Sequence, residues 1–251
     1  MARRWSFDQR AYGLLLHPTS LPGPHGSGDL GPAAEAFVDF LAAAGAHWWQ
    51  MLPVNPVGPG NSPYSPFSAL AGNPLLISLE RLAADGLLTR DELRPPPRLP
   101  ADRVPWSTVT RFRLARLRRA FARWRTDGGP DDPAFQRFCA AEGHWLEDWA
   151  LFASVRRAYE NLPWTEWPRP LRQRTNRAVR QARADLADEL AYERFLQFAF
   201  ERQWQAVRAY AHERGVGLIG DLPIFVAHDS ADVWANPSLF QLDAAGRCTG
   251  T

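Results

Sequence analysis

The sequence contains no lysine, so all 29 of its basic residues are arginine. They are balanced by 27 acidic residues, which leaves a net charge of only +2. A charge this close to zero gives no whole-chain case for a nucleic acid or an acidic membrane as partner. We therefore expect neither kind of partner.

Cysteine is scarce as well, and the two cysteines, Cys139 and Cys248, fit neither a metal-binding spacing nor a disulfide framework. Long apolar runs are also missing. No segment approaches the roughly eighteen consecutive apolar residues of a membrane-spanning helix, and the first residues lack the apolar stretch of a signal peptide. These absences favour a cytoplasmic protein without disulfide bonds or a bound metal.

A short apolar run lies between glycines at residues 215–220 and ends at Asp221. Its length predicts a fully buried parallel strand rather than a helix. In α/β barrels the functional site lies at the C-terminal ends of the strands, which makes Asp221 a candidate for substrate contact. A helix cap or a structural hydrogen bond is the alternative role for this carboxylate.

Two more strands are expected in the first part of the chain. Residues 11–17 form an apolar run halted by Pro18, and residues 47–54 form an aromatic and apolar run closed by turn residues. Between them, Pro32 stands where the first turn of a helix tolerates proline, and apolar residues recur at helical spacing until Gly45. Strand, helix and strand together predict a right-handed parallel crossover.

The loop at residues 58–74 contains too many prolines and glycines for regular structure, and such loops are usually functional. Within it, Tyr64 stands between Pro63 and Ser65 and offers both a ring face and a hydroxyl group. Sugars bind through both kinds of contact. Packing of the tyrosine over the end of a barrel is the alternative.

Residues 75–210 are expected to be mostly helical and to separate the second strand from the third. The helix predicted at residues 111–124 places its arginines mostly on one face, which we interpret as a solvated surface rather than a nucleic-acid or membrane surface. Residues 161–170 contain too many prolines for a helix. Trp164 and Trp167 in that loop are expected to be exposed and able to face a glycan.

Five stretches of this sequence, taken together and in this order, resemble the amylomaltase family of 4-α-glucanotransferases. They are Gly-Leu-Leu-Leu-His-Pro-Thr-Ser-Leu-Pro-Gly from Gly13, Trp-Gln-Met-Leu-Pro-Val from Trp49, Asn-Ser-Pro-Tyr-Ser-Pro-Phe-Ser-Ala-Leu-Ala-Gly-Asn-Pro from Asn61, Tyr-Glu-Arg-Phe-Leu-Gln-Phe-Ala-Phe-Glu-Arg-Gln-Trp from Tyr192, and Gly-Asp-Leu-Pro-Ile-Phe-Val-Ala-His-Asp-Ser-Ala-Asp-Val-Trp from Gly220. Any one stretch alone would be weak evidence.

The resemblance implies a (β/α)8 barrel with a large helical insertion between its second and third strands. It also implies transfer of α-1,4-glucan segments between maltooligosaccharides, with glucose or maltose as acceptor, by a retaining double displacement without any cofactor. Tyr64 resembles the family's aromatic residue beside the sugar at the cleavage point, and Asp221 resembles the carboxylate that hydrogen-bonds that sugar. Ser62 and Trp234 are weaker carry-overs to neighbouring subsites.

The implied domain layout places the first two barrel units and the glucan-binding loop in residues 1–74, the helical insertion in 75–210 and the third strand with its loop in 211–251. Only three barrel strands are present, whereas a closed barrel of this class has eight. We therefore expect apolar strand surface to be uncovered in this chain.

Family members are about twice as long as this chain, and their nucleophile, acid/base and third carboxylate belong to motifs expected beyond Thr251. No carboxylate here stands in such a motif, so the chain alone is expected to be inactive and to match only the N-terminal part of the family. Two alternatives remain open, namely a naturally short, non-catalytic glucan-binding module and a complete enzyme that hydrolyses glucans instead of transferring them.

Overall fold

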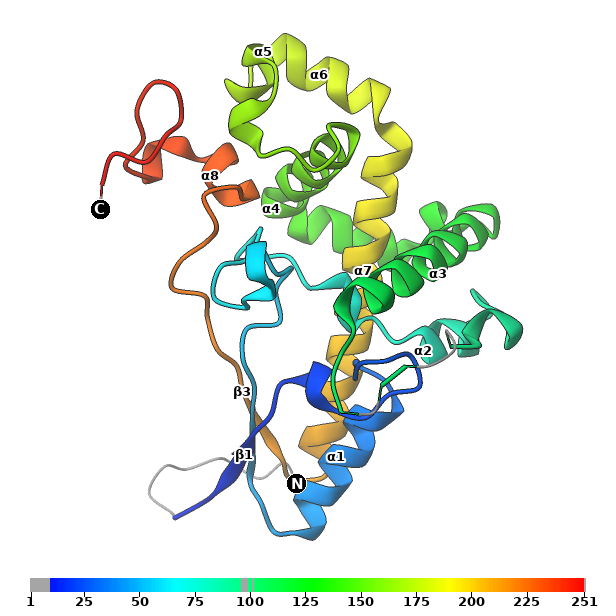
Figure 1. Ribbon diagram of the computed structural model, residues 1–251. Helices are drawn as coiled ribbons and strands as arrows, with labels where there is room; N and C mark the ends of the chain where they lie inside the picture. Colours follow the sequence, from blue (N-terminus) through cyan, green and yellow to red (C-terminus); the bar gives the residue numbers. More distant parts are fainter. Residues whose placement is uncertain (1–9, 96–98, 101, 251) are drawn as a thin grey trace. The chain divides into compact units, whose positions relative to one another are not determined.

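The computed structural model describes residues 10–95, 99–100 and 102–250. These residues form two compact units, whose elements are labelled in Figure 1. The sheet unit, as we call it, takes its described residues from Met1–Val54, Asn73–Pro130 and Phe198–Asp221. The aromatic unit takes its described residues from Asn55–Gly72, Asp131–Gln197 and Leu222–Thr251.

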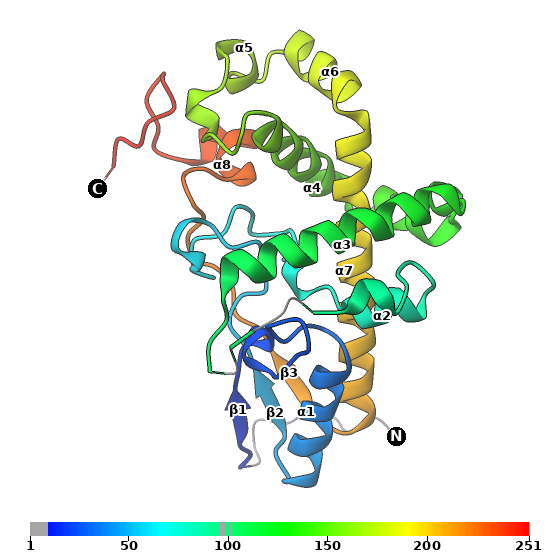
Figure 2. The same ribbon diagram turned by 45° about the vertical axis from the view of Figure 1, so that its right-hand side comes forward.

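Three short strands form the centre of the sheet unit. β1 (Gly13–Leu15), β2 (Trp48–Gln50) and β3 (Gly217–Ile219) pair in parallel in the order β1-β2-β3, as can be followed in Figure 2. This pairing confirms the three strands and their parallel direction, although each strand is shorter than predicted. A Cβ at Gly13 would lie 2.3 Å from the Trp48 carbonyl oxygen, so the close approach of β1 to β2 requires glycine there.

The faces of this sheet differ in burial. Leu15, Gln50 and Ile219 are paired across the three strands and therefore point to one face. All three are exposed or nearly so, with Leu15 at 57 % and Ile219 at 37 %. The prediction that residues 215–220 form a fully buried strand is therefore wrong, because the described residues of the sheet unit leave this face exposed. The expectation of uncovered apolar strand surface is confirmed.

Helices in the sheet unit follow the predicted pattern. α1 (Pro32–Ala43) begins with the expected proline and buries Val38 and Leu41, and the Phe37 ring meets Trp49 of β2 edge-on at 5.0 Å. α2 (Leu79–Ala84) is capped by Ser78, whose side chain accepts the Arg81 backbone N–H. α3 (Trp106–Thr126) and the second part of α7 (Ala187–Glu213) complete this unit.

One arginine of α3 departs from the predicted solvated face. Arg113 is 0 % exposed and forms an ion pair with Asp29 at 2.9 Å. Its guanidinium also donates to the backbone carbonyls of Ser27 at 2.9 Å and Ile77 at 3.2 Å. A buried charge is tolerated only when it is paired and hydrogen-bonded, as it is here.

The aromatic unit is built from α4 (Pro133–Ala158), α5 (Arg169–Arg172), α6 (Asn176–Asp185), α8 (Ala231–Ala235) and the first part of α7. Its core contains Phe152 and Trp167, whose ring centroids lie 5.6 Å apart. Trp164 and Trp167 are only 3 % and 2 % exposed, so the prediction that they face solvent is wrong. Both indole N–H groups donate to backbone carbonyls, those of His228 and Leu162, which allows these large rings to be buried.

The predicted domain layout divided the chain at residues 74 and 210 into barrel and insertion. The compact units divide the chain at other residues. They do not test which residues belong to a barrel, so that layout stays a prediction.

None of the helices in the described part of the chain has the length and apolar character that crossing a membrane requires. Cys139 and Cys248 are free thiols. Within the same residues, no group of three or more histidine, cysteine, aspartate or glutamate side chains could hold a metal ion.

Candidate functional site

The loop that carries Tyr64 is a compact turn within the aromatic unit. The Gly58 N–H donates to the Ser65 carbonyl at 3.1 Å, and Val57 forms an antiparallel bridge with Pro66. Gly60 adopts a positive φ of 76°, which glycine does at no steric cost. The chain therefore reverses direction over a few residues and places Tyr64 on the turn.

Three side chains of the aromatic unit that lie outside this loop anchor it. Asn55 donates to two loop carbonyls, one of them that of Ala69, at 2.9 Å each. Gln197 brackets Gly72 by accepting its N–H at 2.7 Å and donating to its carbonyl at 3.0 Å. Asp232 accepts the Ala69 N–H at 3.1 Å, and burial raises the pKa of this carboxyl group. The loop is thus held as a rigid platform.

Tyr64 and Ser62 are brought together on this platform. The Ser62 hydroxyl accepts the backbone N–H of Tyr64 at 3.3 Å, and the Tyr64 side chain is 45 % exposed. Ser62 therefore shapes the turn that presents the tyrosine ring. A half-exposed ring on a rigid loop is suited to packing against the C–H groups of a ligand.

Asp221 lies in the sheet unit, two residues beyond the end of β3. This position confirms that a partly buried carboxylate follows the carboxyl end of the strand. Because the three strands are parallel, the segments after β1 and β2 leave from the same edge of the sheet. This is the edge at which α/β proteins place their ligands. Tyr64 belongs to the other unit, and its meeting with Asp221 stays a prediction.

His17 is at the same edge, two residues after β1, and the sequence patterns did not single it out. Its Nδ1 lies 2.7 Å from the Thr19 hydroxyl and accepts the Thr19 backbone N–H at 3.3 Å. Burial lowers the pKa of this histidine. A histidine directly at the end of a predicted barrel strand was the signal that could have found it.

Trp234 is placed in the interior of the aromatic unit. Its ring is 1 % exposed, its indole N–H donates to the Leu171 carbonyl at 3.1 Å, and the Arg174 guanidinium stacks 4.3 Å from the ring centroid. These contacts give Trp234 a packing role. Its predicted contact with a glucan subsite is untested and stays a prediction.

The three parallel strands, with α1 between the first two of them, place this chain among α/β proteins. The family model for 4-alpha-glucanotransferases (Glyco_hydro_77) matches residues 16–250, and the chain belongs to this family. It is 47% identical over 241 residues to the 4-alpha-glucanotransferase of Thermus thermophilus and 46% identical over 237 residues to that of Synechocystis. These matches cover 96% and 94% of this chain but only 47% of each relative, so the chain spans about half their length.

Solved structures give the same result for the fold. The amylomaltase from Streptococcus agalactiae in complex with acarbose matches with a TM-score of 0.88 and 33% sequence identity, over 95% of this chain and 48% of that one. The amylomaltase from Corynebacterium glutamicum matches with a TM-score of 0.70 at 21% identity, over 95% of this chain and 33% of that one, which supports the fold alone.

Proposed function

We propose that the protein to which this chain contributes transfers α-1,4-glucan segments from a donor maltooligosaccharide to an acceptor such as glucose or maltose. The observation that carries this proposal is the family match over residues 16–250. It is supported by the S. agalactiae amylomaltase, whose structure holds acarbose and resembles this chain at a TM-score of 0.88. The three parallel strands are proposed to belong to a (β/α)8 barrel, with the helical insertion between the second and third strands.

We assign the substrate contacts residue by residue. Tyr64 packs its half-exposed ring against a sugar at the cleavage point, and Asp221 accepts hydrogen bonds from that sugar's hydroxyl groups. Ser62 holds the Tyr64 turn and borders a neighbouring subsite. Trp234 is assigned to another neighbouring subsite, which its burial allows only if the surrounding side chains move.

The carboxylates of this chain support the view that it does not carry the catalytic pair. A retaining glycosyl transfer uses two carboxyl groups about 5 Å apart, one as nucleophile and the other as acid and then base. The candidates here are engaged elsewhere. Asp29 pairs with Arg113, and Glu147 binds two arginines, Arg183 at 2.6 Å and Arg194 at 2.7 Å.

Three further carboxylates, all in the aromatic unit, also have partners. Asp229 accepts from the Arg156 guanidinium and from the Trp164 backbone N–H, each at 3.0 Å. Asp148 pairs with Arg174, and Asp232 anchors the Tyr64 loop. These contacts hold the aromatic unit together. The alternative, a non-catalytic glucan-binding module, draws its support from the same engaged carboxylates.

Kinetics of maltotriose disproportionation test the proposal, using a longer chain that joins this sequence to the motifs expected beyond Thr251. Asp221→Ala should lower kcat/KM by about 10²-fold, because it removes a charged hydrogen bond of about 1.5–3 kcal/mol and any further gain in the transition state. Tyr64→Ala should act more mildly. Asp91→Asn, at an exposed ion pair with Arg94, is the control.

Full activity in both Asp221→Ala and Tyr64→Ala would contradict the residue assignments. Absence of transfer in the longer wild-type chain would contradict the function itself. Residues 1–251 alone should show no disproportionation, and release of glucose above a blank without protein would mean that one of the carboxylates described above does chemistry.

A further inference from the structure

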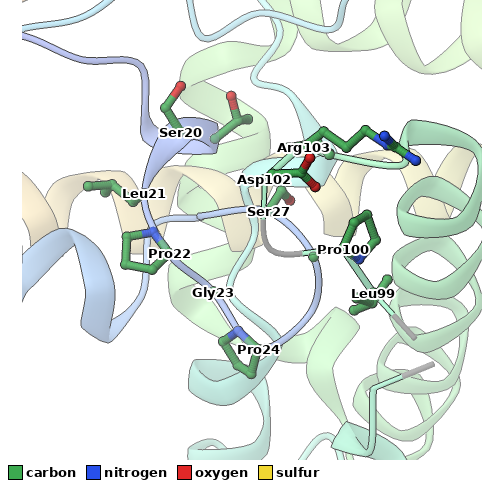
Figure 3. A pocket seen from close by; sticks show the side chains of 13 residues that line it. Ser20, Leu21, Pro22, Gly23, Pro24, Ser27, Leu99, Pro100, Asp102 and Arg103 are labelled. Atoms are coloured by element: carbon green, nitrogen blue, oxygen red, sulfur yellow. The ribbon is translucent and has the colours of Figure 1, made fainter. Parts of the chain in front are cut away.

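The sheet unit has a cavity of about 640 Å³ between the loop after β1 and the segment around Leu99 and Val104 (Figure 3). Its two charged lining residues, Asp102 and Arg103, are exposed, so neither is a buried charge that would hold a ligand. Among the described residues, none that lines this cavity belongs to the Tyr64 loop. The contacts that bear on the assigned tyrosine lie in the aromatic unit instead.

Phe67 closes the foot of the turn that carries Tyr64. Its backbone N–H donates to the Pro56 carbonyl at 2.9 Å, and its own carbonyl accepts the Ala231 N–H at 2.8 Å. The half-buried ring of Phe67 packs against the buried core of the aromatic unit. The position of Phe67 therefore sets the direction in which the turn presents the tyrosine ring.

Arg156 of α4 joins Phe67 to two other segments of the aromatic unit. Its guanidinium lies 4.2 Å from the centroid of the Phe67 ring. Its Nε donates to the Asp229 carboxylate and its Nη1 to the side-chain oxygen of Asn161, each at 3.0 Å. Asp229 follows β3 in the chain and is itself fixed, because its other oxygen accepts the Trp164 backbone N–H. The Arg156 and Asp229 side chains are only 21 % and 15 % exposed, so water screens their attraction weakly.

We propose that Arg156 is a positioning residue of the glucan site, which holds the Tyr64 loop against the segment after β3 and so fixes the tyrosine ring beside the sugar. A planar guanidinium can offer its face to an aromatic ring while its edge donates to two acceptors, whereas a lysine ammonium is a compact point charge. Arg156 acts through Phe67 and does not itself touch the sugar. This inference rests on the proposed function, in which Tyr64 contacts the sugar at the cleavage point.

Kinetics of maltotriose disproportionation by the longer chain test this role through a double-mutant cycle. Arg156→Lys should lower kcat/KM about fivefold, mainly through kcat, because a displaced ring at the cleavage point loses transition-state contacts. In the Tyr64→Ala background, Arg156→Lys should have an effect of less than about twofold, because the residue through which it acts is gone. Loss of general stability alone would give the same factor in both backgrounds.

Arg157→Lys is the matched control on the same helix. Arg157 pairs with Glu189 and Glu193 and lies 5.5 Å from the centroid of the Tyr192 ring. It thus combines ion pairs with a ring contact as Arg156 does, but among the described residues these partners lie outside the Tyr64 loop. Arg157→Lys should leave kcat/KM unchanged. Melting temperatures of both variants show that each is folded at the temperature of the assay.

Hydrogen exchange of the same longer chain measures the position of the loop without any assay of transfer. The backbone amides of Phe67 and Ala231 should exchange faster in Arg156→Lys than in the wild type, and at the wild-type rate in Arg157→Lys. Unchanged exchange at both amides in Arg156→Lys, or an equal loss of kcat/KM in the two backgrounds, would overturn the proposal. Absence of transfer in the wild type would contradict the proposed function, whereas the exchange rates report on Arg156 alone.

Discussion

The two units differ in how fully they bury charged pairs and in how much apolar surface they leave exposed. The sheet unit buries a charged pair, Arg113 with Asp29, and leaves apolar strand residues such as Leu15 exposed. The aromatic unit buries Trp149, Trp164, Trp167 and Trp234, and at least one partner of each of its arginine ion pairs stays partly exposed, as Arg157 does where it pairs with the buried Glu193. The comparison shows that residue type alone does not decide burial. What decides it is whether every polar group in the interior finds a partner.

The two units also hold their loops in place with different kinds of side chain. In the sheet unit, the buried charge fixes the loop after β1 through the Ser27 carbonyl. In the aromatic unit, neutral amides and one carboxylate fix the Tyr64 loop, namely Asn55, Gln197 and Asp232. Removing one partner of the buried charged pair should therefore lower the stability of the protein more than removing one of the amides that hold the Tyr64 loop.

The largest effect is expected at Arg113. Arg113→Leu should destabilise the protein by about 3–5 kcal/mol, because it leaves the Asp29 carboxylate buried without a partner. Urea unfolding of the variant measures this loss. The double variant Arg113→Leu with Asp29→Leu should recover part of the stability, whereas a loss equal to that of the single variant would show that the buried charge is not the cause.

The next effect concerns the aromatic core. Trp234→Phe should cost about 1–3 kcal/mol, because it leaves the Leu171 carbonyl without its indole donor in the interior. Thermal unfolding of the variant and the wild type checks whether the stability falls. The same variant sharpens the Trp234 assignment: a change in maltotriose affinity at unchanged stability would favour substrate contact, and a change in stability alone would favour packing.

A smaller effect is expected at the uncovered face of the sheet. The chain should bind a dye such as ANS and unfold with weak cooperativity, as partly packed states do. Replacing Leu15 and Ile219 by threonine should reduce the dye fluorescence, since both side chains lie on this face. A sharp calorimetric transition without dye binding would contradict the prediction and favour a naturally short binding module.

The smallest effect is a pH dependence at Glu92. Hydrogen bonds from Arg123 and then from Thr89 lower the pKa of Glu92 to about 2. A lowered pKa in the folded protein contributes stability above the unfolded value, near 4.3, and this contribution is lost as the pH falls toward 2. Glu92→Gln should therefore lower the melting temperature at pH 7, and the gap to wild type should narrow by pH 3. A gap that does not depend on pH would show that the ionised carboxylate is not responsible.

Periodicity and turn residues were enough to predict the elements that decide the fold. The apolar runs before Pro18 and Asp221 predicted two of the three strands, and Pro32 predicted the start of α1. The errors came from contacts distant in sequence. Arg113 is buried because Asp29, 84 residues away, meets it, and Trp164 is buried because the His228 carbonyl accepts its N–H. No local pattern reports such partners.

Only those features of the candidate site that depend on local sequence could be predicted. The position of Asp221 after a strand and the half-exposed ring of Tyr64 follow from local sequence. The anchoring of the Tyr64 loop by Gln197 and Asp232 does not, because those residues are more than a hundred positions away along the chain.

We propose that this chain binds an α-1,4-glucan through Tyr64 and Asp221. Calorimetric titration of maltotriose into the 251-residue chain, compared with Tyr64→Ala and Asp221→Asn, tests it most directly. We expect the wild type to bind maltotriose, each variant to bind it more weakly, and Asp91→Asn to bind it as the wild type does. Binding of equal strength in the wild type and both variants, or no binding by the wild type, would contradict it.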